Sequence, residues 1–214
     1  MTKIKICGIK TVTDARAAME AGADLIGFNF YPKSPRFVEV GLCRGIMSTM
    51  RNFGGHVQYV GVFVNASVAQ IRATMETCGL NLAQLHGDES ADMLQELGGK
   101  GFKAFRGIPE NLDGFARQNA PAFLLDASVK GMYGGSGVTA DWSMATVLAK
   151  TYPLLLAGGL NPENVADAVR QVKPWGVDVA SGVEAAPGVK DAGKLKAFVK
   201  AVRSAMTPVI AMTK

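Results

Sequence analysis

Cys7 and Asp126 are the two residues of this sequence best placed to exchange protons with a substrate. Each stands at the end of a predicted strand, KIKIC for Cys7 and AFLLD for Asp126, and the strand before Asp126 is apolar. A thiolate can act as a general base, and a carboxyl group in partly apolar surroundings can donate a proton. The structural alternatives are a buried inert thiol and a carboxylate that anchors a loop. Asp178, inside the run GVDVA, is a rival carboxylate that could instead be structural.

Three basic residues could support this acid–base pair. Because side chains alternate along a strand, Lys5 shares a face with Cys7, and its ammonium would favour the thiolate. Arg36 follows a Ser-Pro pair, where its guanidinium could meet a carboxylate through two hydrogen bonds or could simply be exposed. His86, in the motif QLHGDE, is either a pocket wall or a packing histidine. Two unclustered histidines form no metal-ligand pattern, so a catalytic metal is not expected.

Two glycine turns could hold a phosphate. Gly158-Gly159 follows the run PLLLA, and Ser181-Gly182 follows GVDVA. Glycine has no Cβ, so backbone N–H groups can approach an anion closely, especially beside the N-terminus of a helix. One such turn would be an ordinary strand end, but two on consecutive strands favour phosphate binding. Gly135, in the segment GGSG, belongs to a third glycine loop that could close over a substrate or could simply be flexible.

These residues need a scaffold that brings several strand ends together, and short aliphatic runs do alternate with longer amphipathic segments. Eight strands are predicted, at 3–7, 24–29, 57–64, 81–85, 101–106, 122–126, 153–157 and 176–180. Eight helices are predicted, at 13–21, 40–51, 67–78, 89–97, 111–119, 141–150, 162–172 and 191–204. Thr13 and Ser67 are the predicted caps of the first and third helices.

Eight strand–helix units in 214 residues can form a closed barrel or an open doubly wound sheet. Length and number favour the barrel, and CGIK stands where a nucleotide-binding sheet would carry Gly-x-Gly-x-x-Gly. The predicted fold class is therefore α/β, a single-domain (βα)8 or TIM barrel over residues 1–204. A C-terminal tail of unknown order is predicted at 205–214. The active site of such a barrel lies at the carboxyl ends of its strands, where the candidates above are found.

The composition limits the classes of partner. Hydrophobic residues make up 48% and charged residues 19%, which predicts an ordered globular chain. The net charge of +5 suits an anionic small-molecule substrate, but no basic run indicates nucleic acid. Residues 1–10 place charges inside what would have to be the apolar core of a signal peptide, and no later stretch reaches the ~18 apolar residues of a membrane span. Three scattered cysteines indicate a reducing compartment, so a cytoplasmic protein is expected. The expected assembly is a monomer or a homodimer.

Taken in chain order, the strand ends resemble those of the phosphoribosylanthranilate isomerase family. The motifs that carry the resemblance are KICGIK at 5–10, FYPKSPR at 30–36, QLHGDE at 84–89, LLDA at 124–127, GGSG at 134–137, LAGGLNPENV at 156–165 and GVDVASGVEAAPGVKD at 176–191. The resemblance runs from residue 3 to about residue 200, and seven motifs in the right order make it specific. Small departures occur at Ala127 and Ala180, where a serine or a similar small residue is frequent.

The resemblance implies an aldose–ketose isomerase of tryptophan biosynthesis. Its reaction is the Amadori rearrangement of N-(5'-phosphoribosyl)anthranilate to 1-(2-carboxyphenylamino)-1-deoxyribulose 5-phosphate, by general acid–base catalysis without cofactor or metal. The resemblance implies that Cys7 is the general base, Asp126 the general acid and Arg36 a contact to the anthranilate carboxylate. It also implies that the turns at 158–159 and 181–182 form the phosphate cradle.

Three other barrels are alternatives. The related Amadori isomerase of histidine biosynthesis would have a carboxylate base at the end of the first strand, where this chain has Cys7. Ribulose-phosphate epimerase would require metal-binding histidines on several strands. A barrel that senses a sugar phosphate without converting it would have lost the acid or the base, and this sequence has both.

Overall fold

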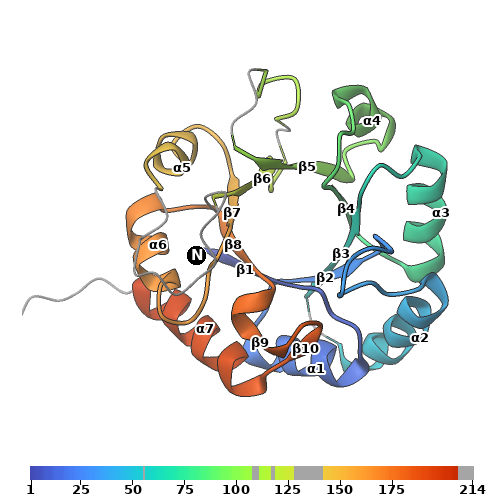
Figure 1. Cartoon of the computed structure of the whole chain (residues 1–214), viewed down its shortest axis with the longest axis horizontal. Helices are drawn as coiled ribbons and strands as arrows, with labels where there is room; N and C mark the ends of the chain where they lie inside the picture. The colour runs from blue at the N-terminus through green and yellow to red at the C-terminus, as the bar shows by residue number, and fades with distance from the viewer. Residues whose placement is uncertain (55, 108–110, 117–118, 128–141, 207–214) are drawn as a thin grey trace, which may run out of the picture.

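Eight parallel strands form a closed barrel, and the helices surround it (Figure 1). The computed structural model describes residues 1–54, 56–107, 111–116, 119–127 and 142–206. The strands are β1 (Lys3–Cys7), β2 (Leu25–Asn29), β3 (Gln58–Phe63), β4 (Leu82–Leu85), β5 (Gly101–Arg106), β6 (Phe123–Asp126), β7 (Leu154–Ala157) and β8 (Gly176–Val179). Strand β8 pairs with β1 and closes the ring. The predicted barrel is confirmed, and each of these strands lies within its predicted range.

Seven of the eight predicted helices are present among the described residues. They are α1 (Val12–Ala21), α2 (Val40–Met50), α3 (Val68–Cys78), α4 (Ala91–Glu96), α5 (Ser143–Leu148), α6 (Val165–Val172) and α7 (Ala192–Ala205). A short 3₁₀ helix, η1 (Arg51–Phe53), extends α2. None of the helices in the described part of the chain is long and apolar enough to cross a membrane.

The predicted helix at 111–119 is wrong for the described part of that segment, which forms turns. The Asn111 side chain accepts a hydrogen bond from the N–H of Gly114 at 3.3 Å. A short polar side chain competes with the helical backbone bonds in this way, and a glycine weakens a helix further. Local turn chemistry therefore prevails over the amphipathic pattern at this position.

One of the two predicted helix caps is correct. Ser67 caps α3 in a full capping box with Gln70. The cap of α1 is Thr11 and not Thr13, because the Thr11 hydroxyl accepts a hydrogen bond from the N–H of Asp14 at 3.0 Å. That bond satisfies one of the free N–H groups at the helix start and places Thr13 inside the first turn.

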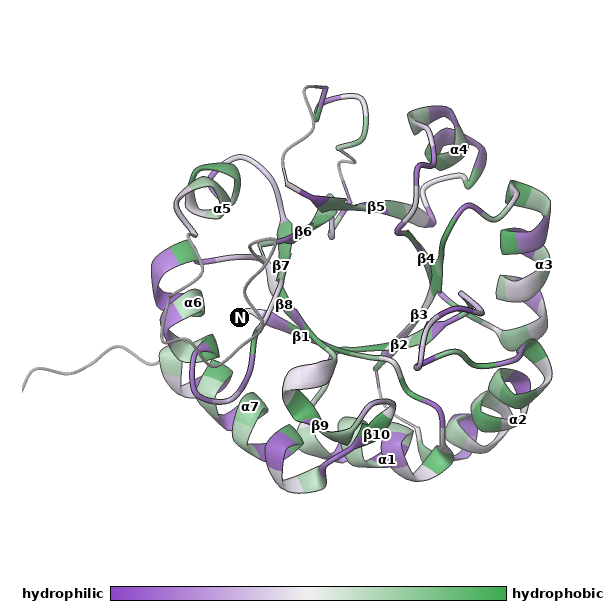
Figure 2. Cartoon of the chain, viewed as in Figure 1, coloured by the Kyte–Doolittle hydropathy of each residue, from purple (hydrophilic) through white to green (hydrophobic). Residues whose placement is uncertain are grey.

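Alternation along the strands sorts the apolar side chains into two cores. One core fills the barrel interior and consists of Leu25, Val60, Leu82, Phe102, Ala104, Leu124, Leu155 and Ala157. The other lies between strands and helices and includes Ile4 and Ile6. Figure 2 shows strands that are mostly hydrophobic and helices that contain both hydrophobic and hydrophilic residues. Because side chains fill the interior, reactive groups can meet a ligand only at the rim of the barrel.

The segment after β8 has structure that the sequence analysis did not predict. A 3₁₀ helix, η2 (Ser181–Val183), leads into a small hairpin of β9 (Glu184–Ala186) and β10 (Val189–Lys190). Helix α7 then returns to β1, where Arg203 donates to the carbonyl of Thr2 at 2.8 Å. Most of the predicted tail, at 207–214, lies outside the described residues.

We expect Phe102→Ala to destabilise the protein by about 3–5 kcal/mol, because Phe102 is fully buried in the barrel interior and its loss leaves a cavity. The matched control is Phe53→Ala on η1, where the side chain is 46% exposed and the change should stay within about 0.5 kcal/mol. Urea unfolding of both variants measures the difference. Equal losses would contradict the assignment of Phe102 to a packed interior.

Candidate active site

Cys7 and Asp126 end β1 and β6, and both side chains face the inside of the barrel at the same rim. Their strand neighbours Ile6 and Leu125 belong to the outer core, so alternation turns Cys7 and Asp126 inward. In the ring, β7 and β8 lie between β6 and β1. The two predicted proton-transfer groups therefore flank the two strands whose turns were predicted to hold phosphate.

Lys5 and Asp178 form a buried ion pair inside the barrel, below Cys7. The two residues are register partners on β1 and β8, and Lys5 Nζ lies 2.9 Å from Asp178 Oδ1. The Lys5 side chain is fully buried. Burial alone would lower the pKa of Lys5, but the pKa is raised because the Asp178 carboxylate opposes burial through its charge and its hydrogen bond, so Lys5 stays cationic.

The electrostatic surroundings of Cys7 differ from the prediction that Lys5 favours the thiolate. Lys5 does act in the expected direction, but burial is the larger effect and raises the pKa of Cys7, and the nearby Asp178 carboxylate adds to this rise. The thiol form therefore predominates at neutral pH. A thiolate that does form here is a stronger base than one with an ordinary pKa.

Two glycines make room for the side chains at this rim. A Cβ on Gly27, in the middle of β2, would come within 2.9 Å of Cys7 Sγ. Gly8 has φ +81°, and a Cβ there would meet Arg36 Cδ at 2.5 Å. A side chain at either position would displace a predicted active-site group. Glycine inside a strand often marks such a close approach, so Gly27 carried a signal that the sequence analysis did not use.

Arg36 lies beside the rim, where its guanidinium forms an ion pair with Glu184 of the β9–β10 hairpin. Its Nε and Nη2 atoms each donate to Glu184 at 2.7 Å. Lys190 Nζ donates to the same carboxylate at 2.8 Å and to the carbonyl of Ala180 at 3.0 Å. Despite its burial, Glu184 has a lowered pKa because Arg36 and Lys190 stabilise its charge.

The cluster of Arg36, Glu184 and Lys190 sums to one positive charge, and its two cations interact electrostatically with Cys7. Burial lowers the pKa of Lys190, although Glu184 opposes the change. The sequence analysis missed both Glu184 and Lys190. They are a buried acid and a buried base six residues apart in an irregular segment, and only the fold shows that they meet Arg36.

The predicted phosphate turns lie next to each other. Gly158 and Gly159 both have positive φ, at 102° and 62°, which agrees with a tight glycine turn after β7. A Cβ on Gly182 would come within 2.0 Å of the carbonyl oxygen of Leu160, so the two turns touch through their backbones. Ser181 begins η2 at the rim. Gly135 of the third glycine loop lies outside the described residues.

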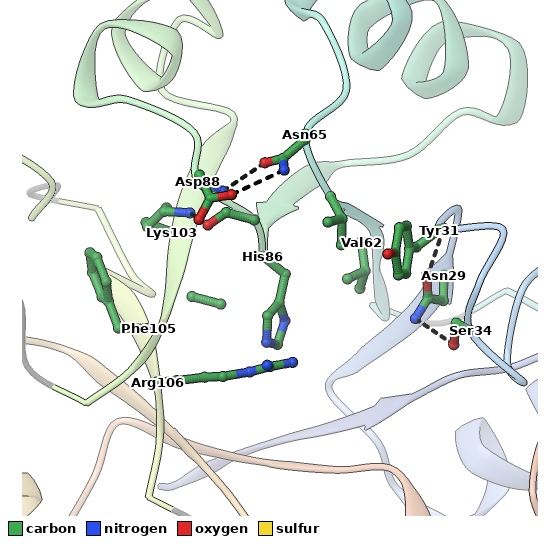
Figure 3. Close-up of a pocket in the computed structure, with 13 residues that line it drawn as sticks. Asn29, Tyr31, Ser34, Val62, Asn65, His86, Asp88, Lys103, Phe105 and Arg106 are labelled. Carbon is green, nitrogen blue, oxygen red and sulfur yellow. Dashed lines mark hydrogen bonds between the residues drawn. The ribbon is translucent and has the colours of Figure 1, made fainter.

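His86 lies on the opposite side of the rim, in a cavity of about 640 Å³ at the carboxyl ends of β2 to β5 (Figure 3). Gln84 Nε2 lies 2.9 Å from His86 Nδ1. Burial, together with the charges of Lys5 and Arg106, lowers the pKa of His86, so the imidazole is neutral at pH 7. His86 is thus a cavity wall, one of the two predicted alternatives.

Residues 4–201 match the family model described as N-(5'-phosphoribosyl)anthranilate (PRA) isomerase. The chain belongs to this family. The N-(5'-phosphoribosyl)anthranilate isomerase of Geotalea uraniireducens is 45% identical over 202 residues, which cover 94% of this chain and 98% of that relative. The corresponding isomerase of Magnetococcus marinus is 47% identical over 208 residues, covering 95% and 96%.

Solved structures of this isomerase family share the fold. The crystal structure of phosphoribosyl anthranilate isomerase from Thermotoga maritima has a TM-score of 0.83 and 38% identity, and it covers 95% of this chain and 100% of its own. Another crystal structure contains the isomerase in complex with reduced 1-(o-carboxyphenylamino)-1-deoxyribulose 5-phosphate. It has a TM-score of 0.80 and 36% identity, with coverage of 95% and 100%.

The described residues contain no group of three or more His, Cys, Asp and Glu side chains that could hold a metal ion. The groups that do converge are a thiol, three ion-paired cations and three carboxylates, those of Asp126, Asp178 and Glu184. Such an arrangement can bind an anionic ligand and move protons at its edge. These are the capabilities that a phosphoribosylanthranilate isomerase requires.

We expect the ionisation of Cys7 to have a midpoint above the ordinary thiol value of about 8.5, because burial outweighs the charge of Lys5. The rate of alkylation by iodoacetamide against pH measures it, in a background of Cys43→Ala and Cys78→Ala. Adding Lys5→Met should move the midpoint higher, whereas Lys100→Met, at an exposed lysine, should not move it. A midpoint below about 8.5 would mean that Lys5 dominates.

Proposed function

We propose that Cys7 and Asp126 are the general base and the general acid of this phosphoribosylanthranilate isomerase. The observation that carries the proposal is their position at one rim, on the two strands that flank β7 and β8. A sugar phosphate anchored on the turns after β7 and β8 would extend between the two groups. Holding a substrate between acid and base is a large part of what a catalyst of this kind contributes.

The reaction follows from the family. It is the Amadori rearrangement of N-(5'-phosphoribosyl)anthranilate to 1-(2-carboxyphenylamino)-1-deoxyribulose 5-phosphate, a step of tryptophan biosynthesis. The rearrangement moves hydrogen from C2′ to C1′ without external oxidant or reductant. General acid–base groups are therefore sufficient for it.

The proposed roles of Asp126 and Cys7 account for the proton transfers of the reaction. Asp126 donates a proton to the ring oxygen while the C1′–O bond breaks, and the nitrogen lone pair forms a Schiff base. The Cys7 thiolate then removes the proton from C2′, and the electron pair moves through C1′ to nitrogen, giving an enolamine. Protonation at C1′ and loss of the hydroxyl proton at C2′ complete the ketone.

The remaining predicted residues would bind the two ends of the substrate. The backbone N–H groups around Gly158, Gly159, Ser181 and Gly182 would hold the phosphate. Arg36 uses Nε and Nη2 for Glu184, and its Nη1 would meet the anthranilate carboxylate. Lys5 and Asp178 would act below the reacting atoms by setting the charge around Cys7.

Location and assembly belong to the same proposal. The cysteines Cys7, Cys43 and Cys78 are all free, which suits a reducing compartment, and we place the enzyme in the cytoplasm as a monomer or homodimer.

A sensor barrel would bind the same ligand through the same turns. A sensor would not, however, require a thiol and a carboxylate at the same rim. A measurement of turnover distinguishes a sensor from an enzyme.

Cys7→Ser and Asp126→Asn should each lower kcat by at least about 10²- to 10⁴-fold, because neither an alcohol nor an amide can transfer the proton. Loss of anthranilate fluorescence on addition of freshly made phosphoribosylanthranilate is the assay, and circular dichroism checks the fold. No turnover by the wild-type protein would refute the proposed activity. An inactive Asp178→Asn beside an active Asp126→Asn would identify Asp178 as the acid instead.

Gly159→Ala should weaken the binding of inorganic phosphate by about tenfold, or about 1.4 kcal/mol, because the new Cβ enters the space that the anion would occupy. Gly98→Ala is a matched control, since Gly98 and Gly159 have φ of +61° and +62° and both have no atom within 4 Å of a new Cβ. Both variants should lose about 1–2 kcal/mol of stability to the left-handed backbone. Unchanged phosphate affinity in Gly159→Ala, measured by calorimetry, would move the phosphate site elsewhere.

A further inference from the structure

Gln84 is a polar side chain in the interior of the barrel. It lies on β4 two residues after Leu82, which belongs to the interior core, and two residues before His86, so alternation turns all three side chains inward. Only 1% of Gln84 is exposed. An unpaired buried polar atom costs stability, so buried amides normally have hydrogen-bond partners for both of their polar atoms. The partners of Gln84 therefore indicate why a polar residue stands at this position.

The side chain of Gln84 has one hydrogen bond among the described residues, and it is made with His86. Its Nε2 atom lies 2.9 Å from His86 Nδ1. Its Oε1 atom is buried and has no hydrogen-bond partner in the described part of the chain. An apolar side chain of similar size would avoid this unpaired oxygen, so stability does not explain the glutamine. What remains is its contact with His86.

This contact fixes the position of the proton on the imidazole ring. An amide nitrogen donates hydrogen bonds and does not accept them, so His86 Nδ1 is the acceptor and carries no proton. The imidazole is neutral at pH 7, because burial and the charges of Lys5 and Arg106 lower its pKa. A neutral imidazole has a single N–H. The hydrogen-bonding network therefore assigns that N–H to Nε2.

The Nε2–H group is available to a ligand at the mouth of the barrel. Gln84 is the one side-chain hydrogen-bond partner of the His86 ring among the described residues, and the ring is only partly buried. Figure 3 shows the ring pointing from the end of β4 into the cavity, beside Arg106. In the barrel, β4 lies across from β8 (Figure 1). The charges of Asp126 and Asp178 act on the ring, so it faces the space where the sugar of the proposed substrate would lie.

We infer that Gln84 is a positioning residue that holds His86 in its Nε2–H form, and that this N–H donates a hydrogen bond to an oxygen of the sugar. The inference rests on the proposed function, because that function supplies the sugar and its position. A neutral donor can bind a hydroxyl or carbonyl oxygen without adding to the positive charge of Lys5. A donor that is already oriented needs little reorganisation when the ligand binds.

Nitrogen-15 NMR of the ligand-free protein tests the tautomer, with His56→Gln removing the only other histidine of the sequence. Near pH 7 the His86 Nε2 signal should be that of a protonated nitrogen and the Nδ1 signal that of an unprotonated one. Gln84→Glu should place a proton on Nδ1, because a carboxylate accepts and does not donate. A proton on Nδ1 of the wild-type ring, or an imidazolium, would overturn the inference.

The same spectra test the hydrogen bond to the sugar. Addition of 1-(2-carboxyphenylamino)-1-deoxyribulose 5-phosphate should shift the Nε2–H signal of His86, whereas inorganic phosphate and anthranilate should each leave it unchanged. No shift with the sugar phosphate, or an equal shift with anthranilate, would overturn the assignment to a sugar oxygen. Failure of the proposed function is a separate result, because the wild type would then not turn over phosphoribosylanthranilate, whatever the tautomer of its free form.

Kinetics and stability separate positioning from a structural role. Gln84→Met should lower kcat/KM about 2- to 10-fold, which corresponds to the net value of one hydrogen bond. Its midpoint of urea unfolding should change little, because the variant loses an unpaired oxygen along with the hydrogen bond. Gln95→Met, at an exposed position of α4, is the matched control and should change neither quantity. A lowered midpoint with unchanged kcat/KM would show that Gln84 is merely structural.

Discussion

The ion pair of Lys5 and Asp178 is the interaction on which both the closed barrel and its chemistry depend. It joins β1 to β8 in register at the seam where the ring closes. Two charges inside an apolar interior are costly to desolvate, and each becomes a large penalty if its partner is lost. A slipped register at the seam would separate them. The pair therefore favours a single closure and also sets the field in which the Cys7 thiol ionises.

Much of the fold could be predicted from the sequence, because strands such as β6 and β7 are short apolar runs, one ending in Asp126 and the other followed by Gly158. Cys7 and Asp126 could be placed at one rim for the same reason, since parallel strands of a barrel end on one side. Glu184 and Lys190 could not, because their meeting with Arg36 depends on an irregular hairpin whose path no local pattern encodes. At 111–119 the amphipathic pattern predicts a helix, but the described residues form a local turn at Asn111 instead.

Close backbone approach is the second constraint on the site. Gly27 leaves space for the Cys7 thiol, Gly8 for the Arg36 side chain, and Gly182 for the carbonyl of Leu160. In each case the neighbour is a predicted functional residue or part of a predicted functional turn. The site is thus defined as much by the side chains that are missing at these three positions as by those that are present.

The contact between Arg36 and Glu184 also determines when conformational entropy is lost. A free arginine side chain gives up as much as about 2 kcal/mol when it is immobilised. For Arg36, held by two hydrogen bonds of 2.7 Å, that loss occurs during folding and not on ligand binding. Arg36 is therefore preorganised, and its contact to an anion would carry a smaller entropic penalty than that of an arginine that is free before binding.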